Sequence, residues 1–155
     1  MPSAEQNADF ERLDEELSQA RAAEPDLIRK VVERVGARIE MLRRSGRPIR
    51  IDRLIEFGGF TEAALALIEL ELPAWTVRRL VHENGEWLCS LSRQPNIPIA
   101  FDEVVETGHE ALPLAILRAV VEACRRRTIA GAKPISTVPL LAQKFGLSLC
   151  CDNFA

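Results

Sequence analysis

Apolar residues recur at helical spacing through the first 44 positions of the chain. A first stripe, spaced 3, 4 and 3 residues apart, predicts a helix over residues 5–23; it consists of Phe10, Leu13, Leu17 and Ala20. A second helix is predicted over residues 25–44, because Pro25 suits a first helical turn and Gly46 ends the pattern. Its stripe is the most regular in the chain: Ile28, Val32, Val35, Ile39 and Leu42. We expect the two helices to form an N-terminal arm.

The strongest local signal is the dipeptide Asn84–Gly85, which lies between two runs of β-favouring residues. This dipeptide is preferred in a two-residue type I′ turn because both of its residues adopt positive φ. It predicts an antiparallel β-hairpin over residues 75–92 in which His82 faces Trp87. A lone hairpin is marginally stable in water, so helices are expected to cover one side of it.

Two further helices are predicted, and their apolar sequences indicate burial. The first covers residues 61–72 and is apolar almost all round from Ala63 to Ile68. The second covers residues 107–127: the spacing of Thr107 and Glu110 matches a capping box, and only two residues between 111 and 124 are charged. A further turn of helix is predicted just before it, over residues 101–106.

These elements predict an α+β fold that is mostly helical, with two apolar core helices packed on one antiparallel β-hairpin. Three regions follow: an N-terminal helical arm, a core and a C-terminal tail, over residues 1–48, 49–127 and 128–155. The core begins with a connector, residues 49–60, and the tail is a linker followed by a predicted short helix, residues 138–145. Such an apolar terminus is expected to pack on the core or on another subunit.

The composition of the 155-residue chain favours a reduced, cytoplasmic protein. The charges nearly balance, with 20 basic and 23 acidic side chains, so no general affinity for polyanions is expected. The N-terminal residues lack a signal-peptide pattern. The longest nearly apolar stretch, residues 111–124, is shorter than the roughly 20 residues of a membrane span. Arginine outnumbers lysine 17 to 3, a bacterial-like ratio that we attribute to coding bias.

No motif in the sequence identifies a catalytic centre, a metal site or a cofactor. The glycines form no phosphate-binding loop, and no two cysteines have zinc-site spacing. Cys89 and Cys124 lie in apolar runs, where cysteine behaves as a small hydrophobe. We therefore predict no metal and no cofactor, and leave a redox role open only for the adjacent pair Cys150 and Cys151.

A pocket at the hairpin is the alternative for an enzyme or a ligand-binding protein. Strict alternation along the strands places Arg78, His82 and Cys89 on one face, with Trp87 as a wall and Val77 on the opposite face. A general base needs an orienting or nucleophilic neighbour that spacing alone does not supply. His82 is more simply interpreted as a cross-strand partner of Trp87, so no catalytic residue is assigned.

Basic charge is concentrated just after the acidic first helix. Residues 1–24 carry 7 acidic and 2 basic side chains, whereas residues 25–56 carry 9 basic and 5 acidic ones. Five arginines crowd into 11 positions: Arg43, Arg44, Arg47, Arg50 and Arg53. We expect them to pair with the first helix, and anion or RNA binding is the alternative. DNA is disfavoured, since a helix-turn-helix over residues 52–70 would present glutamates to the phosphates.

The apolar surface of the predicted helices, hairpin and tail is larger than one small core is expected to bury. We therefore favour a non-catalytic cytosolic interaction module that self-associates, with a dimer preferred over another protein as the partner. The expected contact residues are the stripe of the second predicted helix, with an arginine rim: Ile28, Val32, Val35, Ile39 and Leu42, then Arg43, Arg44 and Arg47. A monomer at micromolar concentration in light scattering would contradict this assignment.

Overall fold

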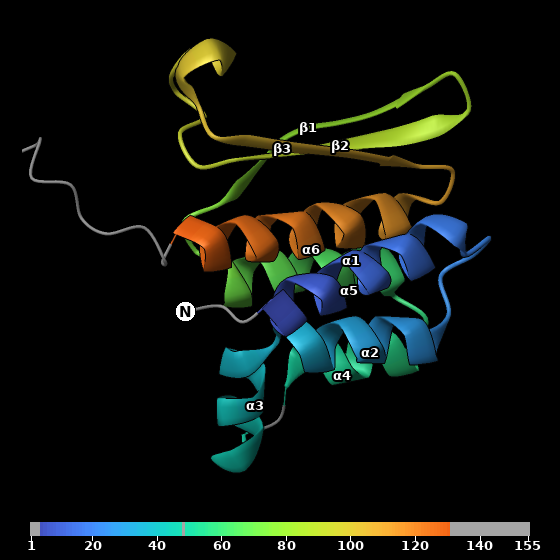
Figure 1. Ribbon diagram of the computed structural model, residues 1–155. Coiled ribbons are helices and arrows are strands. Elements are labelled where there is room, and N and C mark those ends of the chain that lie inside the picture. The colour runs from blue at the N-terminus through green and yellow to red at the C-terminus, as the bar shows by residue number, and fades with distance from the viewer. Residues whose placement is uncertain (1–3, 48, 131–155) are drawn as a thin grey trace, which may run out of the picture.

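The computed structural model describes residues 4–47 and 49–130, which form six α-helices, a three-stranded antiparallel sheet and one short 3-10 helix (Figure 1). The predicted α+β, mostly helical class is confirmed. In chain order the elements are α1 (Ala4–Gln19), α2 (Pro25–Val35), α3 (Ala37–Arg44), α4 (Arg50–Glu56), α5 (Phe60–Glu71), β1 (Thr76–Glu83), β2 (Glu86–Ser92), η1 (Ile99–Phe101), β3 (Val104–His109) and α6 (Leu112–Ala130). Most of the predicted tail, residues 131–155, lies outside the described residues.

The sheet lies on one side of the molecule and the helices lie on the other (Figure 1). α6 packs against β2 and β3, while α1 and α5 pack against α6. α2 contacts both α5 and α6, and α3 and α4 lie farthest from the sheet (Figure 1). α6 is therefore the central helix, as its apolar sequence predicts. No helix in the described part of the chain combines the length and apolarity needed to cross a bilayer.

The first predicted helix packs against the core along its apolar stripe. Phe10, Leu13 and Leu17 of α1 are buried. Arg118 of α6 ties the helix in place, because its Nε donates to Asp14 Oδ1 at 2.8 Å. The same guanidinium donates from Nη1 to the carbonyl oxygen of Gly108 at 2.7 Å. One side chain thus joins α1, α6 and β3.

The predicted hairpin is confirmed, and its register is as predicted from Arg79 to the turn. Asn84 and Gly85 have φ of 54° and 84°, as a type I′ turn requires. His82 pairs with Trp87, and their ring centroids lie 5.0 Å apart. The alternation fails at one position, since a β-bulge lies between Val77 and Arg79. Arg78 is the extra residue, and the bulge exchanges the faces expected for Val77 and Arg78.

The prediction of helix over residues 101–106 is wrong, and so is the capping box at Thr107. Residues 104–109 form β3, which pairs with β2 so that Thr107 lies opposite Cys89. The Thr107 hydroxyl donates to the carbonyl oxygen of Ala115 at 2.8 Å and so ties the strand to α6. β2 needs a second neighbour to complete its hydrogen bonds, and this long-range demand overrides the local capping pattern.

The second predicted helix is broken at Gly36 into α2 and α3. A Cβ at this position would lie 2.2 Å from the carbonyl oxygen of Val32, so only glycine fits the bend. A second difference follows along the chain, where α4 replaces most of the connector predicted for residues 49–60. Its buried residues, Ile51 and Ile55, are spaced for one helical face.

Candidate binding groove

An apolar groove of about 480 Å³ lies between α5 and β1. α6 packs against β2 and β3, whereas every residue of β1 is at least partly exposed. α5 lies beside α6 and forms the opposite wall of the groove. The lining residues come from α5, from the turn after it and from the start of β1: Leu65, Ile68, Glu69, Leu72, Pro73, Trp75, Thr76 and Val77.

The sequence builds the groove through a short turn and a bulge. Pro73 follows the end of α5, and the Trp75 N–H donates to the carbonyl oxygen of Leu72 at 2.9 Å to close the turn. The bulge then places Val77 opposite Leu91, a buried residue of the helix-facing side of the sheet. Val77 is 38% exposed because no helix within residues 4–47 and 49–130 covers it, and it forms the outer lip of the groove.

The groove is nearly free of charge. Of the described residues that line it, only Glu69 is charged, and it is exposed. An apolar surface bordered by one carboxylate suits a segment with aliphatic or aromatic side chains and an accompanying basic group.

The groove opens beside an unpaired strand edge. Among the described residues the sheet order is β1-β2-β3, so β1 pairs only with β2 there. Its outer edge therefore presents backbone N–H and C=O groups that an extended peptide can pair with. An apolar cavity next to such an edge offers both a pocket for side chains and hydrogen bonds for a backbone.

The groove also lies close to the end of the described chain. Arg127, near the C-terminal end of α6, donates from Nη1 to the carbonyl oxygen of Glu71 at 2.8 Å. Glu71 immediately precedes Leu72, which lines the groove. The chain therefore leaves α6 at Ala130 close to the α5 end of the groove.

No protein-family model, curated protein or solved structure matches this chain.

The residues expected to form a self-association interface lie in the core of the single chain, so that assignment is wrong. Ile28 and Ile39 have no exposed surface, Val32 and Val35 are at most 4% exposed, and Leu42 is partly buried against them. The stripe is buried by the contacts of α2 with α4, α5 and α6 and by those of α3 with α5.

The expected pairing of the arginine cluster with the first helix is also wrong. Arg43 pairs through two hydrogen bonds with Asp52, and Arg44 pairs with Glu40 at 3.3 Å. The acidic side chains of α1 pair instead with basic residues of α2 and α6: Lys30, Arg34 and Arg118.

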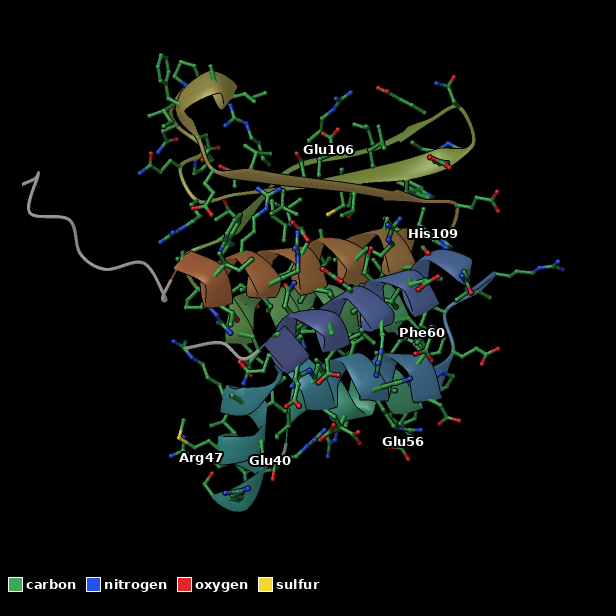
Figure 2. All side chains as sticks on the ribbon, viewed as in Figure 1. Glu40, Arg47, Glu56, Phe60, Glu106 and His109 are labelled. Atoms are coloured by element: carbon green, nitrogen blue, oxygen red, sulfur yellow. The ribbon has the colours of Figure 1, made fainter. Side chains whose placement is uncertain are left out.

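The side chains of three members of the cluster have no ion pair or hydrogen bond with any described residue: Arg47, Arg50 and Arg53. All three are exposed. Figure 2 shows Arg47 beside α3, on the side of the molecule away from the sheet.

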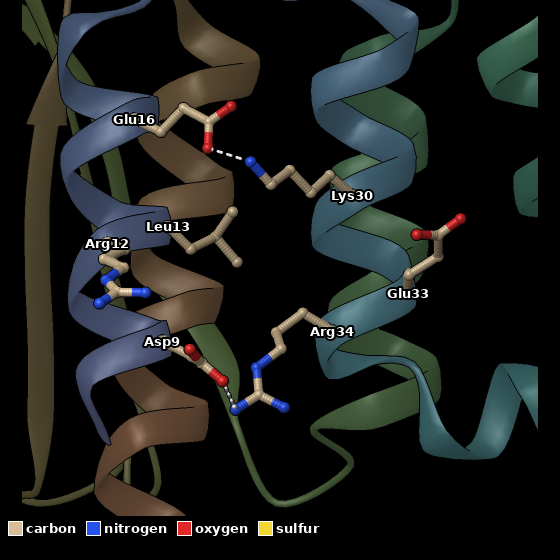
Figure 3. Close-up of a pocket in the computed structure, with 7 residues that line it drawn as sticks. All are labelled: Asp9, Arg12, Leu13, Glu16, Lys30, Glu33 and Arg34. Atoms are coloured by element: carbon tan, nitrogen blue, oxygen red, sulfur yellow. Dashed lines mark hydrogen bonds and ion pairs between the residues drawn. The ribbon is translucent and has the colours of Figure 1, made fainter. Parts of the chain in front are cut away.

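A second cavity, of about 450 Å³, lies between α1 and α2 (Figure 3). Its walls carry three acidic and three basic side chains around Leu13: Asp9, Arg12, Glu16, Lys30, Glu33 and Arg34. Ion pairs cross it from Glu16 to Lys30 and, at 3.1 Å, from Asp9 to Arg34. These pairs join the two helices, so we interpret the cavity as their salt-bridged seam.

The structure does not bring His82, Cys89 and Arg78 together. Cys89 has no exposed surface, and burial raises the pKa of its thiol to about 12. His82 is exposed against Trp87, near the turn. Arg78 donates to Asp102 Oδ2 at 2.7 Å and to the carbonyl oxygen of Ile97 at 3.2 Å, in the loop between β2 and β3.

Asp102 organises that loop, and the sequence alone did not reveal it. Its side chain has no exposed surface, and it accepts hydrogen bonds from the Ser92 hydroxyl and from the Gln94 N–H at 2.9 Å, besides the one from Arg78. Desolvation favours the neutral acid, but these donors outweigh it and hold the pKa of Asp102 below its ordinary value. The arrangement anchors the loop rather than exposing a reactive carboxyl group.

Within residues 4–47 and 49–130, no three side chains of His, Cys, Asp or Glu lie close enough together to hold a metal ion. Cys124 is buried like Cys89, and desolvation raises the pKa of its thiol to about 11. Cys150 and Cys151 lie outside the described residues. His109 ends β3, and its Nδ1 accepts a hydrogen bond from the Ala111 N–H at 2.8 Å.

Proposed function

We propose that this chain is a non-catalytic, cytoplasmic protein-interaction module that binds an apolar peptide segment in the groove between α5 and β1. The observation that carries the proposal is the position of the groove, an apolar cavity directly beside the unpaired edge of β1. Side chains of the segment would enter the cavity while its backbone pairs with the strand.

The expected affinity is moderate. An aliphatic side chain that becomes fully buried contributes about 1.5–3 kcal/mol, and the groove has room for roughly two or three of them. Association costs at least about 4 kcal/mol in lost translational and rotational freedom. Hydrogen bonds to β1 and the carboxylate of Glu69 would then add specificity for an extended, basic segment.

This proposal moves the contact surface away from the one expected on α2. The stripe of α2 is core, so the self-association assigned to it has no contact residues left there. The partner is instead an apolar segment of another protein.

The test places photoreactive benzoylphenylalanine in the full chain at position 77, with position 81 of the same strand as the matched control. Val77 lines the groove, whereas Val81 is paired with Leu88 and does not line it. On irradiation in cells, position 77 is expected to give adducts with a second protein and position 81 is not. Equal adducts from both positions, or none from either, would contradict the proposal.

A second candidate function is anion binding by Arg47, Arg50 and Arg53. The observation that favours it is their exposure without a counter-charge among the described residues. A short single-stranded RNA is then expected to bind with an affinity that falls steeply with salt, and the triple variant R47Q/R50Q/R53Q to lose that binding. Binding that the triple variant retains would exclude this site.

A further inference from the structure

We infer that a second copy of this chain docks on the open edge of β1, antiparallel to it, about a two-fold axis through Val81. The sheets of the two copies then join into one continuous sheet. The inference goes beyond the proposed function and rests on a different observation, the order of the charged side chains along β1.

Residues 79–83 form the regular part of this edge. They lie between the bulge at Arg78 and the turn at Asn84–Gly85, and they pair with residues 86–90 of β2 in unbroken register. Among the described residues, β1 has no neighbouring strand on its other side. A regular, unpaired strand is a template on which another strand can form backbone hydrogen bonds.

The backbone groups that point outward at this edge belong to Leu80 and His82. In a two-residue hairpin the residues that flank the turn, Glu83 and Glu86, exchange both backbone hydrogen bonds, and such pairs alternate along the strands. Val81 therefore bonds β2, while the N–H and C=O groups of Leu80 and His82 face away from it. A second copy centred on Val81 sets its own His82 opposite Leu80, so these groups bond each other across the axis.

The side chains on the outer face of the same run are self-complementary. Arg79, Val81 and Glu83 alternate onto the face turned away from the helices, where Arg79 donates to Glu83 of the same chain at 2.7 Å. A two-fold axis through Val81 sets Arg79 of each copy opposite Glu83 of the other. Moving the axis by one residue would set Arg79 opposite Val81 or Gly85 of the second copy, so only the Val81 axis pairs the opposite charges.

The packing and exposure of these side chains suit such a contact. Residues that face each other at a non-hydrogen-bonded position lie closest together, and opposite charges there stabilise the pairing. The side chains of Arg79 and Glu83 are 49% and 51% exposed, so each is accessible to a second chain. Val81, which is partly exposed, meets its own counterpart between the two ion pairs.

The second copy would compete with the apolar segment of the proposed function. With the axis at Val81, the hairpin turn of the second copy lies beside Val77, the outer lip of the groove. The second copy then takes up the strand edge with which the segment's backbone would pair. Dissociation of the dimer should therefore increase the capture of another protein at position 77.

Sedimentation velocity of the full chain tests the contact by charge reversal. We expect a dimer at concentrations of the order of 100 µM, since a single strand pair gives a small interface. R79E and E83R each set like charges opposite each other and should weaken the dimer about tenfold or more. The double variant R79E/E83R restores opposite charges and should return the dissociation constant to within about threefold of the original.

The matched control is R44E. Arg44 forms an exposed ion pair with Glu40, four residues away in the chain, but on α3 and away from the sheet. The charge change is the same as in R79E, so an effect of net charge alone would appear in both variants. We expect R44E to leave the dissociation constant unchanged.

A disulfide at the axis gives a second readout. The variant V81C, in a C150S/C151S background, brings two thiols together at a non-hydrogen-bonded position, where the Cα atoms lie about 4.5 Å apart and a disulfide is allowed. Oxidation with diamide should link two copies. The control L88C lies on the same face of the hairpin, opposite Val81 but on the inner strand, and should stay monomeric under the same conditions.

Three results would overturn the dimer: a monomer at about 100 µM, an unchanged dissociation constant in both R79E and E83R, or linkage of V81C no faster than that of L88C. The proposed function fails separately, if position 77 captures no other protein even in R79E. Photoreactive adducts between two copies, expected at position 81, differ in mass from the capture of another protein at position 77.

Discussion

The carboxylate of Glu71 accepts a hydrogen bond from the backbone N–H of Ile39 at 2.8 Å, although 32 residues separate the two in the chain. Ile39 lies in the first turn of α3, whose N-terminal N–H groups have no partner within the helix. Gly36, the residue before that helix, has no side chain to cap it. A buried glutamate from α5 therefore caps α3 from outside, and this contact holds the bend between α2 and α3.

Replacement of Glu71 by alanine should destabilise the fold by about 2–3 kcal/mol. The change removes a cap, worth roughly 0.5–2 kcal/mol, and leaves a buried N–H without an acceptor. Glu71→Gln keeps an acceptor oxygen and should cost less. Urea unfolding measures the difference, with Glu69→Ala on the exposed face of the same helix as the control, expected within about 0.5 kcal/mol of the unmodified chain. Equal costs at the two positions would argue against the cap.

Replacement of Arg118 by methionine should loosen α1. The side chain is 23% exposed and binds both Asp14 and the carbonyl oxygen of Gly108. We expect a loss of about 1–3 kcal/mol and faster hydrogen exchange in residues 4–19, since charge-assisted hydrogen bonds to two elements disappear. Arg12→Met, at an exposed position of α1, is the control. Unchanged exchange in α1 would show that its apolar stripe alone docks the helix.

The two buried thiols should be inert in the folded protein. In a C150S/C151S variant, only Cys89 and Cys124 can react with iodoacetamide. Burial raises their pKa to about 12 and about 11, so little thiolate forms at pH 8. Alkylation is expected to be at least about 100-fold slower than for the same variant unfolded in urea. Rapid alkylation of folded Cys89 would instead support the alternative hypothesis of a reactive pocket at the hairpin.

The carboxyl group of Asp102 should make stability depend on acid pH. The fold lowers the pKa of Asp102. The ionised side chain therefore stabilises the fold fully at pH values above its ordinary pKa of about 3.9. This stabilisation is lost as the pH falls through the lower pKa of the folded state. Asp102→Asn should therefore lower the Tm at neutral pH, with a difference from the unmodified chain that shrinks below about pH 4. Glu103→Gln, which changes an exposed ion pair with Arg93, is the control. A pH-independent difference would assign the effect of Asp102→Asn to packing.

The candidate groove could be predicted only in part. The helix that forms one wall and the strand that forms the other both follow from the sequence pattern, and so does the end of that helix at Pro73. The role of Val77 does not follow, because the bulge at Arg78 reverses the alternation that placed it on the opposite face. Which residues line the groove also depends on which strands α6 covers. Packing between segments that are distant in the chain determines that coverage.

The sequence by itself determined the elements whose causes are local. Asn84–Gly85 set the hairpin register through the φ angles of two residues, and apolar periodicity located α1, α5 and α6. The tertiary structure decided the rest: that residues 104–109 pair with β2, that Glu71 caps α3, and that the stripe of α2 is core rather than interface. Each of these depends on a hydrogen-bond partner or a covering surface far along the chain, and local periodicity carries no information about such partners.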